Sequence, residues 1–212
     1  MNKTIAEHKE SKVSEPRIKA GTVVVITGPM FSEKSGELIR RLLKLEKYGR
    51  QKVKAYKPTE DTRFSENEIV SRIGHSFPAT NIPKELTSEI VENILIEAED
   101  YSTLAFSESQ FFSAEILYLI EELADRGKNI ILDGLNLDFR AKAFGSMGDL
   151  IAMADEVVKL FAFCACCGSS NGTHTQRILN GQPAKPGPII VIGDTENYEP
   201  RCRTCFVPPT KA

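Results

Sequence analysis

One stretch near the start of the chain restricts the fold more than any other, because an apolar run, a short loop and an amphipathic segment follow one another directly. Residues 22–27 (TVVVIT) form a continuous β-branched run, which is typical of a strand buried on both faces of a parallel sheet. The segment 34–48 places apolar residues at helical spacing and charged residues on the opposite side. The sequence therefore predicts a strand–loop–helix unit.

The loop of this unit matches the phosphate-binding pattern G-x-x-x-x-G-K-[ST] at Gly28, Lys34 and Ser35. In such a P-loop, backbone N–H groups and the helix N-terminus hold phosphate oxygens, the lysine reaches the β and γ charges, and the serine hydroxyl binds Mg²⁺. The alternative is an ordinary turn between a strand and a helix. The P-loop interpretation predicts that ATP phosphates are bound by Gly28, Pro29, Met30, Phe31, Ser32, Glu33, Lys34 and Ser35.

Glu33 departs from this pattern, since it stands where the second glycine belongs. That position often needs a positive φ, which glycine adopts most easily. A carboxylate there also repels an incoming triphosphate. We therefore expect Glu33 to weaken ATP binding.

Alternation of strands and helices continues along the chain to about residue 163 and predicts an α/β core with a largely parallel sheet. The expected strands are 53–56, 102–106, 129–133 and 157–162, and the expected helices are 85–97, 114–126 and 149–154. Beyond this point Cys, Gly, Pro and polar residues dominate, and 189–192 is the only clear strand. We expect a disordered polar tail (1–20), a P-loop core (21–163), a small metal-held lobe (164–208) and a short tail (209–212).

Composition excludes several classes of protein. The 212 residues carry a formal net charge of −2 and are 41% hydrophobic, which suits one soluble domain with a small addition. The near-zero charge predicts no binding to duplex nucleic acid or to an anionic membrane surface. No apolar run approaches the roughly 20 residues of a membrane span. The charged first 19 residues lack the apolar region of a signal peptide, so we expect a cytoplasmic protein.

All five cysteines lie after residue 163, and four of them form two C-x-x-C pairs. The pairs are Cys164 with Cys167 and Cys202 with Cys205, and two such pairs supply the four thiolates of a tetrahedral zinc site. Four thiolates leave no open position, so the predicted zinc is structural. The fifth cysteine, Cys166, could replace a member of the first pair, and His174 is a weaker competitor. A zinc-ribbon module for nucleic acid is disfavoured, because the pairs lack a basic, aromatic-rich surrounding.

Taken together and in order, several segments between about residues 21 and 208 resemble the type II (cellular-type) thymidine kinases. Each segment alone is a weak signal, but the ordered series is specific. The segments are 28–35 (GPMFSEKS), 37–41 (ELIRR), 57–58 (KP), 61–64 (DTRF), 108–112 (ESQFF), 134–140 (GLNLDFR), 144–145 (FG), 175–177 (TQR), 193–198 and the two cysteine pairs.

The resemblance implies a RecA-like P-loop core with a zinc lobe, typically assembled as a homotetramer. It also implies ATP- and Mg²⁺-dependent phosphorylation of the thymidine 5′-hydroxyl, with Glu108 as the base on that hydroxyl. Backbone groups near Val191, in the segment that closes over the nucleoside, would bind the pyrimidine edge. The base pocket would be lined by Met30, Phe111, Leu135, Phe139, Thr175, Ile189 and Tyr198. The competing interpretations are a solvated loop acid for Glu108 and ordinary core positions for the apolar residues.

Four positions depart from the family pattern, and most of them lie near the expected triphosphate. They are Glu33 for Gly, Gly36 for Thr or Ser, Ser107 for the Asp associated with Mg²⁺, and Asn136 for Asp. These departures raise the alternative of a weakly active or inactive paralogue that still binds a nucleoside. Asp133, which ends an apolar run, is a candidate replacement for the missing acid. We favour the simpler interpretation that Asp133 forms a turn before Gly134.

Overall fold

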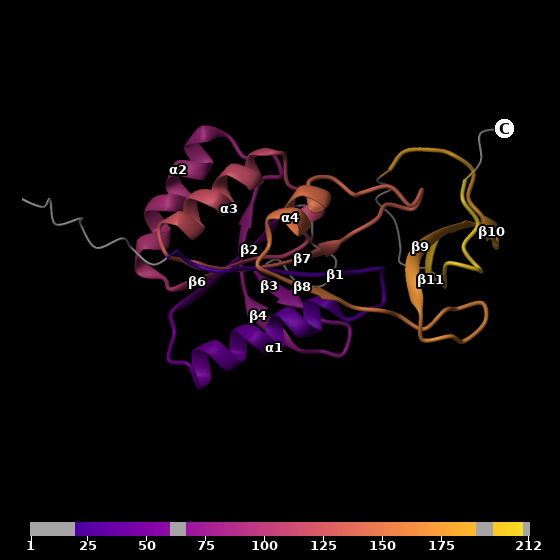
Figure 1. The fold of residues 1–212 in the computed structure, drawn as a ribbon, viewed down its shortest axis with the longest axis horizontal. Helices are drawn as coiled ribbons and strands as arrows, with labels where there is room; N and C mark the ends of the chain where they lie inside the picture. Colours follow the sequence, from indigo (N-terminus) through magenta and orange to yellow (C-terminus); the bar gives the residue numbers. More distant parts are fainter. Residues whose placement is uncertain (1–19, 60–66, 190–196, 210–212) are drawn as a thin grey trace, which may run out of the picture.

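A computed structural model describes residues 20–59, 67–189 and 197–209, and shows a parallel sheet between helices with a smaller β-rich lobe beside it (Figure 1). The six strands of the central sheet follow the order β5-β2-β6-β7-β1-β8, and every adjacent pair is parallel. The α/β class and the parallel sheet are therefore confirmed. The strands are β1 (Val23–Gly28), β2 (Val53–Pro58), β5 (Thr80–Ile82), β6 (Thr103–Phe106), β7 (Asn129–Leu135) and β8 (Glu156–Lys159).

Helices cover both faces of this sheet, which explains the continuous apolar runs of its strands. Helix α1 (Lys34–Lys47) lies on one face, and α2 (Ser88–Glu97), α3 (Glu115–Asp125) and α4 (Met147–Met153) lie on the other (Figure 1). Consecutive residues of β1 serve different faces: Val25 packs in the cluster that contains α3, and Ile26 packs in the cluster that contains α1. Both are fully buried.

Smaller elements complete the core. The antiparallel hairpin of β3 (Glu68–Val70) and β4 (Ser76–Pro78) packs near α1. Two short 3₁₀ turns, Ala98–Asp100 and Ser109–Phe111, follow α2 and β6. Among the described residues, no helix has both the length and the apolar character needed to cross a membrane.

The bounds of several elements differ from the predicted ones. Helix α2 begins at Ser88 rather than at residue 85, because the Thr87 side chain caps it by accepting a hydrogen bond from the Ile90 N–H at 3.4 Å. Strand β8 ends at Lys159, three residues before the predicted end. Strand β7 continues to Leu135, so Asp133 lies inside a strand and the turn interpretation for Asp133 is wrong.

The C-terminal lobe contains a three-stranded antiparallel sheet in the order β10-β9-β11. Its strands are β9 (Gly172–Leu179), β10 (Gln182–Pro183) and β11 (Tyr198–Cys202). The long interval between the two cysteine pairs favours a β-hairpin or an ordered loop there, but the sequence did not locate these strands. The strand expected at 189–192 is wrong at Ile189, which lies in a bend, and residues 190–192 lie outside the described residues. The 61–64 segment also lies outside the described residues. The same holds for both predicted tails, apart from residues 20 and 209.

Candidate functional site

The loop after β1 closes on itself through the carbonyl oxygen of Pro29. This oxygen accepts hydrogen bonds from the Lys34 ammonium at 2.9 Å and from the Ser32 hydroxyl at 2.8 Å. Gly28 is required at the strand end, since it has φ 153° and a Cβ there would lie 2.5 Å from the Leu160 carbonyl oxygen. The loop thus curls around the start of α1, with the buried Lys34 directed into it. This is the geometry expected of a phosphate-binding loop.

Glu33 adopts the left-handed conformation that the glycine pattern implies, with φ 59° and ψ 35°. Its carboxylate oxygen Oε2 is buried and has no hydrogen-bond partner among the described residues. The same oxygen lies 3.1 Å from the place that a Cβ on residue 36 would occupy. The Glu33 carboxylate therefore fits against the first turn of α1 because Gly36 has no side chain, and two departures from the family pattern are spatially linked.

Glu33→Gly is expected to tighten ATP binding about tenfold, which corresponds to about 1.4 kcal/mol. The substitution removes a negative charge from the start of α1, where phosphates are predicted to bind, and it places glycine at a positive φ. Calorimetric titration with ATP measures the effect, with Glu46→Gly, at an exposed position farther along α1, as the control. Thymidine affinity should stay the same. Equal ATP affinity in the wild type and Glu33→Gly would contradict the prediction.

An acidic centre faces the loop from the ends of the two neighbouring strands β6 and β7. Asp133, of which 1% is exposed, accepts a hydrogen bond from the Ser35 hydroxyl at 3.1 Å through Oδ2. Its other oxygen, Oδ1, accepts the backbone N–H of Glu108 at 3.1 Å. Burial raises the pKa of Asp133 above its usual range, and the charge of Glu108 adds to the rise. A hydrogen bond from Ser107 and the charge of Lys34 act in the opposite direction.

Glu108 follows β6 in a left-handed conformation, with φ 51°. Its carboxylate accepts a hydrogen bond from the side-chain amide of Gln110. Gln110 is buried, and its own oxygen accepts the Leu135 N–H at 3.0 Å. Gln110 thus fixes the Glu108 carboxylate relative to the end of β7, a role that the sequence analysis missed although Gln110 lies in the ESQFF segment.

The buried Arg177 of β9 brings together three of the residues predicted to line the base pocket. Its guanidinium lies 3.8 Å from the centre of the Phe139 ring, and its Nε donates to the Tyr198 hydroxyl at 3.0 Å. The two terminal nitrogens donate to the carbonyl oxygens of Pro188 and Ile189, each at 2.7 Å. Arg177 was not predicted as a site residue. The one sequence signal for Arg177 was its position in the TQR segment.

The remaining predicted pocket residues lie in different surroundings. Met30 of the loop donates its N–H to the Thr175 hydroxyl at 3.0 Å, which joins the phosphate loop to β9. Phe111 packs edge to face on Phe144, with 5.6 Å between ring centres. Leu135 is half-buried at the end of β7. Val191 lies outside the described residues.

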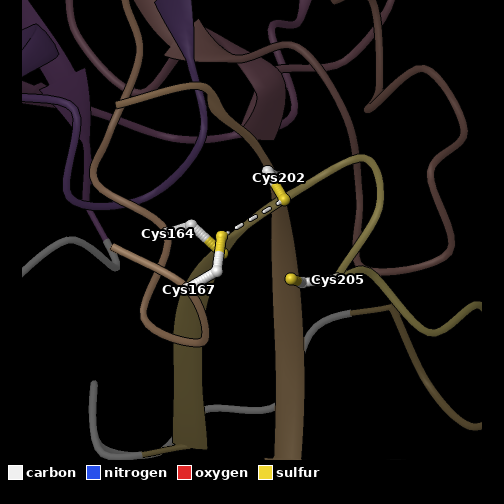
Figure 2. Close-up of side chains that lie close together, drawn as sticks. All are labelled: Cys164, Cys167, Cys202 and Cys205. Carbon is white, nitrogen blue, oxygen red and sulfur yellow. Dashed lines mark hydrogen bonds between the residues drawn. The ribbon is translucent and has the colours of Figure 1, made fainter. Parts of the chain in front are cut away.

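The four cysteines of the two C-x-x-C pairs come together in the lobe, where they could hold a zinc ion (Figure 2). Their sulfur atoms lie within 4.8 Å of one another, and the Cys167 and Cys202 sulfurs are 3.8 Å apart. Zn–S bonds of about 2.3 Å in a tetrahedron require sulfurs about 3.8 Å apart, so the cluster fits the ion.

The two competing zinc ligands are not in this cluster. Cys166 is exposed, and the predicted outer pair supplies the sulfurs instead. The ring of His174 stacks on Phe206 with 4.5 Å between centres and hydrogen-bonds the Thr173 hydroxyl through Nδ1.

Comparison with known proteins gives one family match that covers most of the chain. The model described as "TK: Thymidine kinase" matches residues 21–206. Among solved structures, the Legionella pneumophila ATPase DotB is similar at 19% identity and a TM-score of 0.38, over 63% of this chain and 34% of that one. Domain III of the Thermotoga maritima replication initiation protein DnaA is similar at 13% identity and a TM-score of 0.36, over 65% of this chain and 54% of that one. The chain thus spans about a third and about half of these two structures.

Proposed function

The chain belongs to the thymidine kinase family, and on that premise we propose that it transfers the γ-phosphate of ATP to the 5′-hydroxyl of thymidine in nucleoside salvage for DNA synthesis. The observation that carries this proposal is the contact between the phosphate loop and the two strand-end acids. Ser35 of the loop touches Asp133, and Asp133 in turn holds the backbone of Glu108. These contacts support the proposal, because they would hold a phosphate-binding loop and a carboxylate base within one site.

The loop residues perform the positioning part of the reaction. Backbone N–H groups at the start of α1 and the Lys34 ammonium would hold the triphosphate, with its γ-phosphate toward β6 and β7. Lys34 would exchange its present bond to the Pro29 carbonyl for phosphate oxygens. Mg²⁺, when bound with ATP beside Ser35, would neutralise charge on the β- and γ-phosphates.

Glu108 would accept the proton of the thymidine 5′-hydroxyl as the oxygen–phosphorus bond forms. The bond between the γ-phosphorus and the bridging oxygen breaks, and ADP leaves with the electron pair. Gln110 keeps the Glu108 carboxylate in place for this step. General-base assistance of this kind typically contributes about 10²–10⁴ in rate.

The base pocket would form between the loop after β7 and the lobe. Arg177 holds Phe139, Tyr198 and the carbonyls that lead into the 190–196 segment, so it fixes the walls against which a pyrimidine would lie. Thr175 ties this wall to Met30 of the phosphate loop. Backbone groups near Val191 would bind the pyrimidine edge.

The proposal extends to the zinc, the assembly and the location. Four thiolates would fill the coordination of one structural Zn²⁺, since no position stays open for substrate. The family resemblance supports a homotetramer in the cytoplasm that takes thymidine and ATP, and neither duplex nucleic acid nor a membrane, as partners.

Purified protein with ATP, Mg²⁺ and labelled thymidine is expected to form thymidine monophosphate, and Lys34→Ala should abolish this product. The second candidate function, a paralogue that binds nucleoside without efficient phosphoryl transfer, is favoured by Glu33 in the loop. Thymidine binding by calorimetry without product formation would select that second candidate. Absence of both binding and product would contradict both functions.

A further inference from the structure

We propose that Asp133, which lies within β7 two residues before its end, is the acid that holds Mg²⁺ together with Ser35 in this chain. The inference rests on the proposed kinase function and deepens it. In P-loop proteins the metal is held by the loop Ser or Thr and by an aspartate at the end of a neighbouring strand. Here the Ser35 hydroxyl lies 3.1 Å from the Asp133 carboxylate, on the strand directly beside β1.

The surroundings of Asp133 are those of a metal-binding carboxylate rather than of a structural turn. The residue lies within β7 and is 1% exposed, although burying a carboxylate costs free energy. One of its oxygens is fixed by the Glu108 N–H, which leaves the other directed toward the loop serine. Mg²⁺ commonly uses one or two carboxylates, with waters and phosphates as the other ligands, so a single acid is sufficient.

Ser107 explains why the acid stands on β7 in this chain. Strands β6 and β7 pair with Phe106 opposite Leu132, so positions 107 and 133 lie at the same level at the strand ends. The Ser107 side chain hydrogen-bonds the Asp133 carboxylate. Carboxylates at both positions would therefore touch and repel each other. Of these two facing positions, only position 133 on β7 carries a carboxylate in this chain, and position 107 carries Ser instead of the Asp that the family pattern has there.

Mn²⁺ binding, followed by electron paramagnetic resonance in the presence of a non-hydrolysable ATP analogue, tests the proposal without relying on turnover. Asp133→Asn is expected to weaken Mn²⁺ binding at least tenfold, while binding of the analogue in EDTA stays unchanged. Asp149→Asn, an exposed position in α4, serves as the matched control. Folded Asp133→Asn protein that binds Mn²⁺ as the wild type does would overturn the assignment.

The exchange variant Ser107→Asp/Asp133→Ala supplies a second test, which keeps the proposal testable even if the Asp133→Asn protein does not fold. It returns one carboxylate to the same place from β6, so Mn²⁺ affinity should recover to within a few-fold of the wild type. A folded exchange variant without Mn²⁺ binding would overturn the inference that positions 107 and 133 offer a carboxylate to the same metal.

The outcomes also separate the metal site from the proposed kinase function. If Mn²⁺ binding depends on Asp133 but the wild type makes no thymidine monophosphate, the metal site stands and the kinase proposal is wrong. If turnover is normal and Mn²⁺ binding does not depend on Asp133, the assignment of Asp133 as a metal ligand is wrong while the kinase function stands.

Discussion

Cys205→Ser is expected to remove zinc from the protein and to unfold the C-terminal lobe, while the central sheet stays folded. The four sulfurs lie within 4.8 Å of one another and join the segment before β9 to the end of β11. Structural zinc contributes about 10–16 kcal/mol of apparent binding free energy in small domains, and a lobe this small has little other core. Losing one thiolate therefore removes the main restraint on residues 164–208.

Elemental analysis of freshly purified, reduced protein should find about one zinc per chain in the wild type and almost none in Cys205→Ser. Hydrogen exchange should become fast in β9 and β11 of the variant and stay slow in β1 and β7. Cys166→Ser is the matched control, because Cys166 is not among the four clustered cysteines, and this variant should keep its zinc. Wild-type protein without zinc, or Cys205→Ser protein that retains it, would refute the zinc assignment.

The same substitution should weaken thymidine binding, since the lobe supplies part of the proposed pocket. Thr175 and Arg177 lie on β9, and they hold Met30, Phe139 and Tyr198. Once β9 loosens, these walls lose their fixed positions. ATP binding should change less, because the phosphate loop belongs to β1 and α1.

The core was predictable because its signals are local and periodic. An apolar β-branched run followed by helical spacing specifies β1 and α1 without reference to distant residues. The cysteine cluster could be predicted from the sequence as well, because two cysteines three positions apart form half of a zinc site by themselves.

The lobe strands were missed because their buried side chains are polar. Strand β9 buries Gln176 and Arg177, which a hydrophobicity pattern assigns to the surface. Their partners come from later segments: Gln176 bonds both backbone groups of Val207, and Arg177 bonds the carbonyls of Pro188 and Ile189. A buried polar strand is stable only through such partners, and sequence spacing does not reveal them.

Asp133 was misjudged for a related reason. Locally, an Asp before a Gly is typical of a turn. The structure instead places Asp133 inside β7, where it bonds Ser35 from nearly a hundred residues earlier, and this approach depends on the pairing of β7 with β1. The sequence also did not predict the contact between Glu33 and Gly36, because each residue taken alone is only a departure from the family pattern.

Glu108→Gln is expected to lower thymidine turnover by about 10²–10⁴-fold, because the amide cannot accept the 5′-hydroxyl proton. The shape of the site should persist, since a glutamine oxygen can still accept the hydrogen bond from Gln110 and the Glu108 backbone still bonds Asp133. The Michaelis constant for thymidine should therefore change little, and the loss should be in kcat.

Steady-state kinetics at saturating ATP measure this split, with Glu121→Gln on the exposed side of α3 as the control. A second variant, Gln110→Leu, separates positioning from proton transfer. It leaves the Glu108 carboxylate in place as a base but removes the bond that orients it, so kcat should fall by about tenfold and less than in Glu108→Gln. Unchanged kcat in Glu108→Gln would remove Glu108 from the role of base. A rise in the Michaelis constant alone would instead make Glu108 a ligand of the thymidine sugar.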